Sequence, residues 1–301
     1  MLRLPRNSYL LLTLTSLFWA GNMVMSRGLR EDLPPVGLAF WRWAIALLCV
    51  LPLALPHLRS QWPLLRQAWK PLLFLGVFGI GCYNTLSYVA VQYTTATSAT
   101  LLNSFIPVAT LALAFVLFGR RLGRLEACGV LVSLSGVALL ISRGEPASLL
   151  SLGLNIGDLW MLGAVLAWSL YTVGLQWRPA GVDPMLLLAT LIVIGLLLMA
   201  PLYLWELASG RYIRVHAGSL AGILYAGVVA AFLGVLLFNR ALAVVGPAVG
   251  SLFIHLQPVF AALLSIALLG EYPQGYHLAG MALVLSGIGL TMRAPAAAST
   301  R

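Results

Sequence analysis

A few aromatic and amide side chains interrupt the apolar stretches of this chain, and they are its candidates for chemistry. Within residues 8–27, a set of four recurs at spacings of four, three and four, which places them on one face of a helix: Thr15, Trp19, Asn22 and Ser26. Such groups either make interhelical hydrogen bonds, worth about 0.6–2 kcal/mol each, or line a wetted cavity. Both interpretations stay open, and the nearness of Asn22 to Trp19 favours the cavity.

Two tryptophans stand at an unusual depth in their apolar segments. Tryptophan normally lies at the headgroup level of a membrane, and Trp160 and Trp177, near the two ends of one segment, fit that position. Trp19 and Trp168 instead lie near the middle of theirs, where an indole needs a partner for its N–H. We expect both to line a cavity, with buried helix packing as the alternative. Tyr171 shares a helix face with Trp168.

A third group is dense in polarity for an apolar segment. Residues 70–92 contain Tyr83, Asn84 and Tyr88. The two tyrosines offer flat apolar rings with hydroxyl groups, which suits an amphiphilic ligand. We expect this group to line a cavity, and Gln92 to lie at the interface.

Pro107 and Pro258 fall inside predicted helices. A proline there removes a backbone donor and frees the carbonyl four residues earlier, here of Asn103 and Ile254. The freed carbonyls could touch a substrate, or the prolines could kink the helices for gating or merely for packing.

Asn103, His255 and Gln257 lie beside these prolines and are further candidates for substrate binding. His255 is the one histidine predicted deep in a span. It could bind a carboxylate, relay a proton, or remain a neutral hydrogen-bonded core residue, and the sequence leaves these three roles open.

Charged side chains are rare inside the apolar segments. Arg42 is the clear exception; it can extend part of the way to the interface, so we assign it a structural role while leaving a direct role open. Glu271, like Glu126 and Asp158, falls at a predicted helix end, where a dipole partner or a solvated charge is expected.

Catalytic and metal-binding patterns are missing from the sequence. It has no HExxH, no phosphate-binding glycine loop, no acidic pair and no plausible Ser/His/Asp set. The three cysteines, Cys49, Cys82 and Cys128, all fall in apolar segments and form neither a metal cluster nor a disulfide framework. We therefore expect no enzyme, no cofactor and no metal.

The composition identifies the surroundings in which these residues must work. The 301 residues are 61% hydrophobic and only 9% charged, whereas soluble domains carry about 25% charged residues. Only helices and closed barrels span lipid, and a spanning helix needs about 20 residues. An all-α integral membrane protein is predicted, with ten spans near 8–27, 35–56, 70–92, 96–118, 124–142, 157–177, 184–205, 217–239, 247–269 and 274–292.

The basic residues set an orientation rather than a nucleic-acid partner. The net charge is +10, but the basic residues are scattered through short loops. With the N-terminus inside, twelve of them fall on the inner side and five on the outer side, which predicts that both termini are cytoplasmic.

The chain is duplicated. Trp19 matches Trp168 at a separation of 149, and Pro107 matches Pro258 at 151. Leu134-Ser135-Gly136 recurs as Leu285-Ser286-Gly287. Residues 1–150 and 151–301 are therefore expected to be two five-helix repeats of one membrane domain. An odd number of helices inverts the second repeat, which is the architecture of many secondary transporters with alternating access.

The sequence resembles the EamA-type members of the drug/metabolite transporter superfamily over essentially its whole length. The resemblance rests on Trp19–Asn22 (WAGN), Arg42-Trp43, Ser98–Pro107 (SATLLNSFIP), Gly250–Pro258 (GSLFIHLQP) and Leu269-Gly270-Glu271. The first copy departs from the family's frequent Gly-Glu, because Arg120 follows Gly119. Within the family the chain is similar to bacterial YddG-type exporters, which implies export of amino acids, aromatic ones included, across the bacterial cytoplasmic membrane.

The absence of acidic residues at mid-span favours transport without ion coupling, because coupled carriers keep carboxylates deep in the membrane. Proton exchange through His255 is the second interpretation. Drug or cation export would call for a buried carboxylate, and a nucleotide-sugar carrier for several basic residues in the cavity. Neutral or zwitterionic small molecules are favoured, with membrane lipid as the surroundings and no nucleic acid. GxxxG at Gly246–Gly250 is attributed to helix packing, and the oligomeric state stays open.

Overall fold

Helices make up the computed structural model, which describes residues 5–119, 123–145, 155–245 and 253–293 and contains no strand in those ranges. The elements are α1 (Pro5–Gly28), α2 (Pro35–Gln67), α3 (Trp69–Leu75), η1 (Gly76–Cys82), α4 (Tyr83–Tyr93), α5 (Ala96–Asn103), α6 (Ile106–Phe118), α7 (Arg124–Ile141), α9 (Ile156–Gly174), η2 (Leu175–Trp177), α10 (Pro184–Ala208), α11 (Ala217–Leu224), η3 (Tyr225–Leu233), α12 (Gly234–Val245), α14 (Gln257–Leu269) and α15 (Gly275–Arg293).

The ten predicted spans are confirmed as helices over their described residues. Seven helices are long and apolar enough to cross a membrane, and three shorter apolar helices cover 127–140, 257–269 and 275–290. The start of the ninth span, the GxxxG at 246–250 and the boundary expected between residues 150 and 151 lie outside the described residues. α2 continues eleven residues beyond its expected end at 56 and is helical to Gln67 despite Pro52, Pro56 and Pro63. Residues 57–67 contain no glycine that would end the helix.

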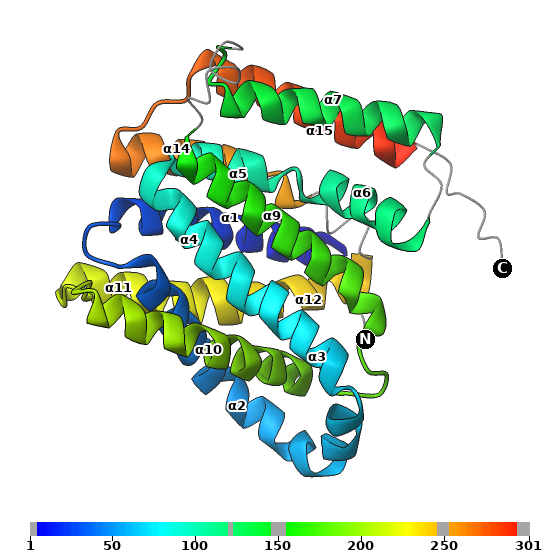
Figure 1. Cartoon of the computed structure of the whole chain (residues 1–301), viewed down its shortest axis with the longest axis vertical. Coiled ribbons are helices and arrows are strands. Elements are labelled where there is room, and N and C mark those ends of the chain that lie inside the picture. Colours follow the sequence, from blue (N-terminus) through cyan, green and yellow to red (C-terminus); the bar gives the residue numbers. More distant parts are fainter. Residues whose placement is uncertain (1–4, 120–122, 146–154, 246–252, 294–301) are drawn as a thin grey trace.

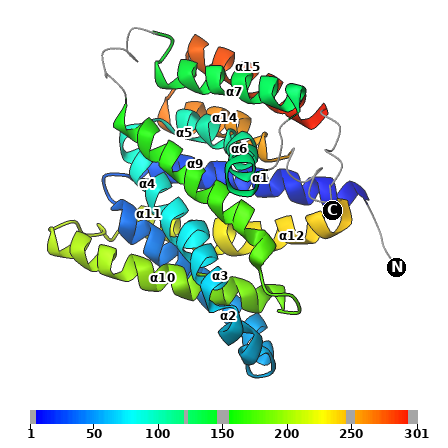
Figure 2. The ribbon, with the colours of Figure 1, turned by 45° about the vertical axis from the view of Figure 1, so that its right-hand side comes forward.

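The helices are arranged as pairs that join the two repeats. α7 and α15 lie side by side along one edge of the bundle, and α2 and α10 lie together along the opposite edge (Figures 1 and 2). Between these pairs, α4 packs on α9 and α1 packs on α12 and α14. The inner spans of each repeat therefore pack against those of the other.

Irregular backbone recurs at the separation of 151 residues found in the sequence. A π-helical stretch begins at Gly76 in the third span, and Gly227 lies within the corresponding π stretch of the eighth span. The fourth and ninth spans are both broken by a two-residue turn, at 104–105 and at 255–256. Gly119 and Gly270 then end these spans with left-handed φ values of 62° and 65°, a conformation that favours glycine.

The contacts between repeats obey the same symmetry. A Cβ on Gly76 would lie 2.6 Å from a side-chain carbon of Ile194, and a Cβ on Gly227 would lie 2.7 Å from the side chain of Ile45. Ile45 and Ile194 are themselves 149 residues apart. The π stretches thus pack by glycine against isoleucine in both halves, and close backbone approach holds them to α10 and α2.

Candidate functional site

A polar network lies in the interior of the bundle, and we call it the Arg42 cluster; it comprises Arg42, Asn84, Tyr88 and Asn22. Nη1 of Arg42 donates to Oδ1 of Asn84 at 2.8 Å and to the hydroxyl of Tyr88 at 2.9 Å. The Tyr88 hydroxyl donates in turn to Oδ1 of Asn22 at 3.0 Å. All four side chains are buried, Arg42 being 8% exposed. The first three spans are therefore joined through one cationic side chain.

The π stretch of the third span orients this cluster. The Asn84 amide donates to the carbonyls of Ile80, at 2.9 Å, and Gly79, at 3.4 Å, so its Oδ1 is turned toward Arg42. A π-helix frees carbonyls for side chains in this way, and such stretches are frequent at functional sites. The guanidinium also lies 5.3 Å from the ring centroid of Trp43 and 5.8 Å from that of Tyr88.

A second group, the aromatic cluster, consists of Tyr83, Trp168 and Tyr171 with Asn103. The ring centroids of Tyr83 and Trp168 are 4.6 Å apart, and those of Trp168 and Tyr171 are 5.0 Å apart. The Tyr83 hydroxyl donates to Oδ1 of Asn103 at 3.2 Å, at the end of α5. The cluster joins the third, fourth and sixth spans, so residues of both repeats build it.

Trp19 has a different environment from its repeat partner Trp168. Its indole N–H donates to the carbonyl of Ala230, in the π stretch of the eighth span, at 3.0 Å, and its ring lies 5.2 Å from that of Phe238. Gly234 faces Trp19, with the position of a Cβ only 2.8 Å from Nε1, whereas Tyr83 occupies the equivalent place beside Trp168. The interhelical hydrogen bond considered as the alternative for Trp19 is thus present.

The prolines begin helices instead of bending continuous ones. Pro107 and Pro258 stand in the first turns of α6 and α14, directly after the breaks in the two spans. A proline is well accommodated there because its missing N–H would have no partner in the first turn anyway. His255 lies in the second break, with Nδ1 buried and without a hydrogen bond in the described part of the chain. Gln257 is buried at the start of α14.

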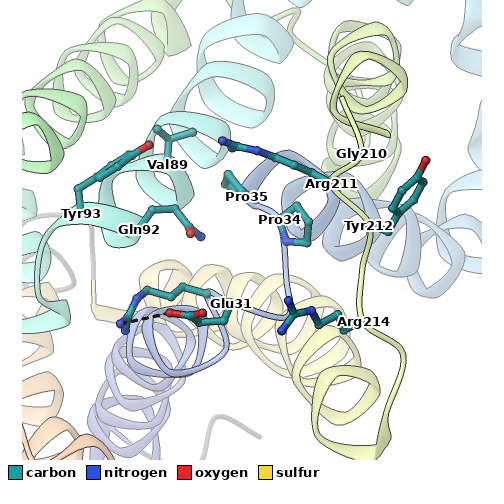
Figure 3. A pocket seen from close by; sticks show the side chains of 11 residues that line it. Glu31, Pro34, Pro35, Val89, Gln92, Tyr93, Gly210, Arg211, Tyr212 and Arg214 are labelled. Carbon is teal, nitrogen blue, oxygen red and sulfur yellow. Dashed lines mark ion pairs between the residues drawn. The ribbon is translucent and has the colours of Figure 1, made fainter. Parts of the chain in front are cut away.

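The end of the bundle at which α1 ends holds a cavity of about 470 Å³. It is lined by the loop after α1, the last residues of α4 and the loop after α10, including Arg30, Glu31, Gln92, Arg211 and Arg214. Figure 3 shows Arg211 reaching toward Val89 across the start of α2. Gln92, expected at the interface, thus contributes to the wall of a basic cavity.

Two buried ionisable residues near helix ends, Glu206 and His277, are not among the candidates named from the sequence. Glu206, 3% exposed, accepts hydrogen bonds from the backbone N–H of Gly37 at 2.7 Å and Val36 at 3.2 Å. It caps α2, which begins at two prolines and has no side-chain cap of its own. His277 is buried and bonds through Nε2 to Ser98 at 2.9 Å. The sequence signal was an ionisable side chain at the edge of an apolar segment: Glu206 follows the predicted end at 205, and His277 lies one turn inside the segment 274–292.

Glu271 and Asp158 lie near helix ends, as predicted, but both are more buried than solvated charges would be. Glu271 pairs with Arg27, and Oε2 of Glu271 is buried without a partner among the described residues. Asp158 is 2% exposed and accepts from the Thr94 hydroxyl at 2.6 Å. Trp160 and Trp177 are 40% and 44% exposed, in keeping with an interfacial position.

Apolar helices in two repeats, with one buried polar cluster inside the first repeat and an aromatic cluster built by both, define a multi-pass membrane protein. The model of the EamA-like transporter family matches residues 6–142 and again residues 155–293. The chain belongs to this family, and it is accordingly a membrane transporter.

Similar proteins carry names of the same kind. The chain is 26% identical to an "Uncharacterized transporter" of Archaeoglobus fulgidus, covering 94% of this chain and 96% of that one. It is 25% identical to the "Uncharacterized transporter YyaM" of Bacillus subtilis, with 94% and 92% covered. An uncharacterized protein of Pseudomonas aeruginosa is 33% identical, with 95% of each covered. A crystal structure shares the fold at a TM-score of 0.60 and 21% identity, covering 95% of this chain and 96% of that one.

Proposed function

We propose that this transporter exports small neutral or zwitterionic metabolites, amino acids including aromatic ones, from the bacterial cytoplasm by alternating access and without ion coupling. The observation that carries the proposal is the aromatic cluster. Trp168 packs against Tyr83 and Tyr171, and Tyr83 is held by Asn103. Stacked rings with hydroxyl and amide groups beside them fit a flat amphiphilic side chain.

The position of the cluster also supports transport across the membrane. Its members belong to the third, fourth and sixth spans, where the two repeats meet. Inverted repeats place substrates between the halves, near mid-membrane, and each half can exchange conformation with the other. A substrate held there is available to either side in turn.

Export of drugs or other cations by proton antiport is the second candidate. The buried carboxylate of Asp158, hydrogen-bonded to Thr94, favours it, because a buried acid can exchange a proton with a cationic substrate. Asp158 lies in the first turn of α9, away from the aromatic cluster in the middle of that helix.

The test is competition in a reconstituted system. Proteoliposomes loaded with labelled L-phenylalanine would be challenged with each amino acid and with quaternary ammonium compounds. We expect competition by aromatic and other apolar amino acids and none by quaternary cations. Competition confined to the cations would refute amino-acid export and favour the second candidate.

A further inference from the structure

Arg42 is a buried cation whose hydrogen bonds leave one side of the guanidinium unused. Both Asn84 and Tyr88 accept from Nη1. Nε is buried without a partner, and no hydrogen bond from the described residues uses Nη2. The unused side is the one formed by Nε and Nη2, which presents two parallel N–H donors of the kind that bind a carboxylate.

The charge of Arg42 is also uncompensated within the described ranges. No aspartate or glutamate there forms an ion pair with it, and its partners are a neutral amide and a neutral hydroxyl. A buried cation without a counter-ion is costly unless something anionic completes its environment. The site is therefore prepared for an anionic group that the chain itself does not supply.

The basic cavity begins about two turns of α2 from Arg42, toward the end of the bundle at which α1 ends. Pro35 lines the cavity and is seven residues from Arg42, which places both on one face of α2, about 10 Å apart along the helix. Gln92 lines it too and is one turn from Tyr88 on α4. Arg30, Arg211 and Arg214 contribute three positive charges to the lining. Glu31 pairs with Arg30 and Asp32 pairs with Arg214, both at 3.8 Å, so one positive charge stays in excess. Such a mouth raises the local concentration of anions.

We infer that Arg42 binds the carboxylate group of the transported substrate through Nε and Nη2, and that the cavity lined by Arg211 and Arg214 is the route by which this group reaches or leaves Arg42. The inference rests on the proposed function and adds the recognition element. Asn84 belongs to the Arg42 cluster and its neighbour Tyr83 to the aromatic cluster. The two clusters therefore lie at the same level of α4, and the rest of an aromatic amino acid held on Arg42 is expected to extend toward Tyr83 and Trp168.

The experiment compares acids with their uncharged or cationic analogues. Inhibition of labelled L-phenylalanine counterflow would be measured with 3-phenylpropionate, L-phenylalaninamide and phenethylamine, in the full-length protein and in R42Q. For the wild type we expect the acid to inhibit at least about tenfold more strongly than the amide or the amine. In R42Q, inhibition by the acid should become about tenfold weaker, while inhibition by the amide and by the amine should change by less than about twofold.

R59Q is the matched control, because Arg59 is exposed on the same helix and the substitution removes the same charge. It should preserve the wild-type preference for the acid. If R42Q also preserves that preference, the assignment of Arg42 is wrong, while amino-acid export stands. If R42Q does not yield a folded protein, R42K takes its place. Its ammonium lacks the paired donors, so an undiminished preference for the acid in R42K would overturn the inference.

A binding measurement separates this inference from the proposed function. If the wild type moves no amino acid, the change in Tm caused by 3-phenylpropionate is measured in detergent for the wild type and R42Q. A rise in the wild type that is lost in R42Q supports the carboxylate site although amino-acid export has failed. No rise in the wild type overturns the site as well.

Discussion

Arg27 and Glu271 tie the end of the first span to the loop between the last two. Nε of Arg27 lies 3.0 Å from Oε1 of Glu271, and Nη1 of Arg27 donates to the carbonyls of Val91 and Gln92, both at 3.1 Å. Three separate segments are thus held by one guanidinium. The repeat relates Arg27 to Gln176, so the opposite end of the bundle has no arginine at the matching position. The Arg27–Glu271 contact therefore favours closure of the bundle at the end where α1 ends, and the repeat provides no equivalent contact at the other end.

Loss of this ion pair should open the end of the bundle at which α1 ends. E271Q should raise the rate at which a membrane-impermeant thiol reagent labels S26C in a cysteine-free background, because Ser26 is buried two residues before the end of α1. The pair is partly exposed, so we expect a change of about 1 kcal/mol in the opening equilibrium. Exposed Glu31 provides the control, and E31Q should leave labelling unchanged. Equal labelling in E271Q and the wild type would contradict a closing role.

Trp168 should affect transport where Trp160 on the same helix does not. W168A removes the ring that joins Tyr83 to Tyr171 and should lower phenylalanine flux about tenfold, since aromatic pairs contribute about 0.5–1.5 kcal/mol beyond their buried area. W160A removes an exposed indole and should stay within about twofold of the wild type. Expression and Tm are measured for both. Similar flux in the two variants would show that the aromatic cluster does not contact substrate.

Gly287 and Gly289 offer a matched test of the contact between α7 and α15. A Cβ on Gly287 would lie 2.7 Å from the backbone nitrogen of Ser133, whereas one on Gly289 would meet nothing within 4 Å. G287A should therefore lower the stability by about 1–3 kcal/mol through overpacking. G289A should be neutral or slightly stabilising, because alanine favours helix. Tm in detergent checks both, and equal Tm values would contradict the close packing of this pair.

Glu206 should stabilise the start of α2. E206Q keeps the shape of the side chain but replaces one accepting oxygen with an amide donor, which faces the backbone N–H of Val36 or Gly37. We expect a loss of about 1–3 kcal/mol, the usual effect of leaving a buried group unsatisfied. Thermal unfolding of E206Q, with E31Q as the exposed control, measures it. An unchanged Tm in E206Q would mean that the cap contributes nothing.

Periodicity predicted the faces of the helices but not their partners across the bundle. The spacing of Trp19 and Asn22 placed both on one face of α1, and the repeat showed Trp19 and Trp168 to be equivalent. Yet Trp19 bonds to a carbonyl of the eighth span and Trp168 packs on Tyr83, because the facing residues are Gly234 in one repeat and Tyr83 in the other. The network of Arg42 with Asn22 depends on how three helices are rotated against each other, which no single helix specifies.

Irregular backbone was predictable only where residue type fixes it. Pro107 and Pro258 indicated where two spans depart from regular helix. Gly119 and Gly270 end these spans in the left-handed conformation that glycine adopts readily. The π stretches carry no comparable signal, since they arise where glycines allow close approach to Ile194 and Ile45. The orientation of Asn84 toward Arg42 follows from those stretches, so this part of the site emerged only from the fold.

The most direct test of the central claim is counterflow of labelled L-phenylalanine into proteoliposomes that hold unlabelled phenylalanine, with equal pH and equal sodium on both sides. Transport by alternating access without ion coupling predicts rapid accumulation of label in the wild type and a loss of about tenfold in W168A, as argued above from the aromatic pair. Accumulation that requires an imposed pH gradient, or none under any gradient, would contradict the claim.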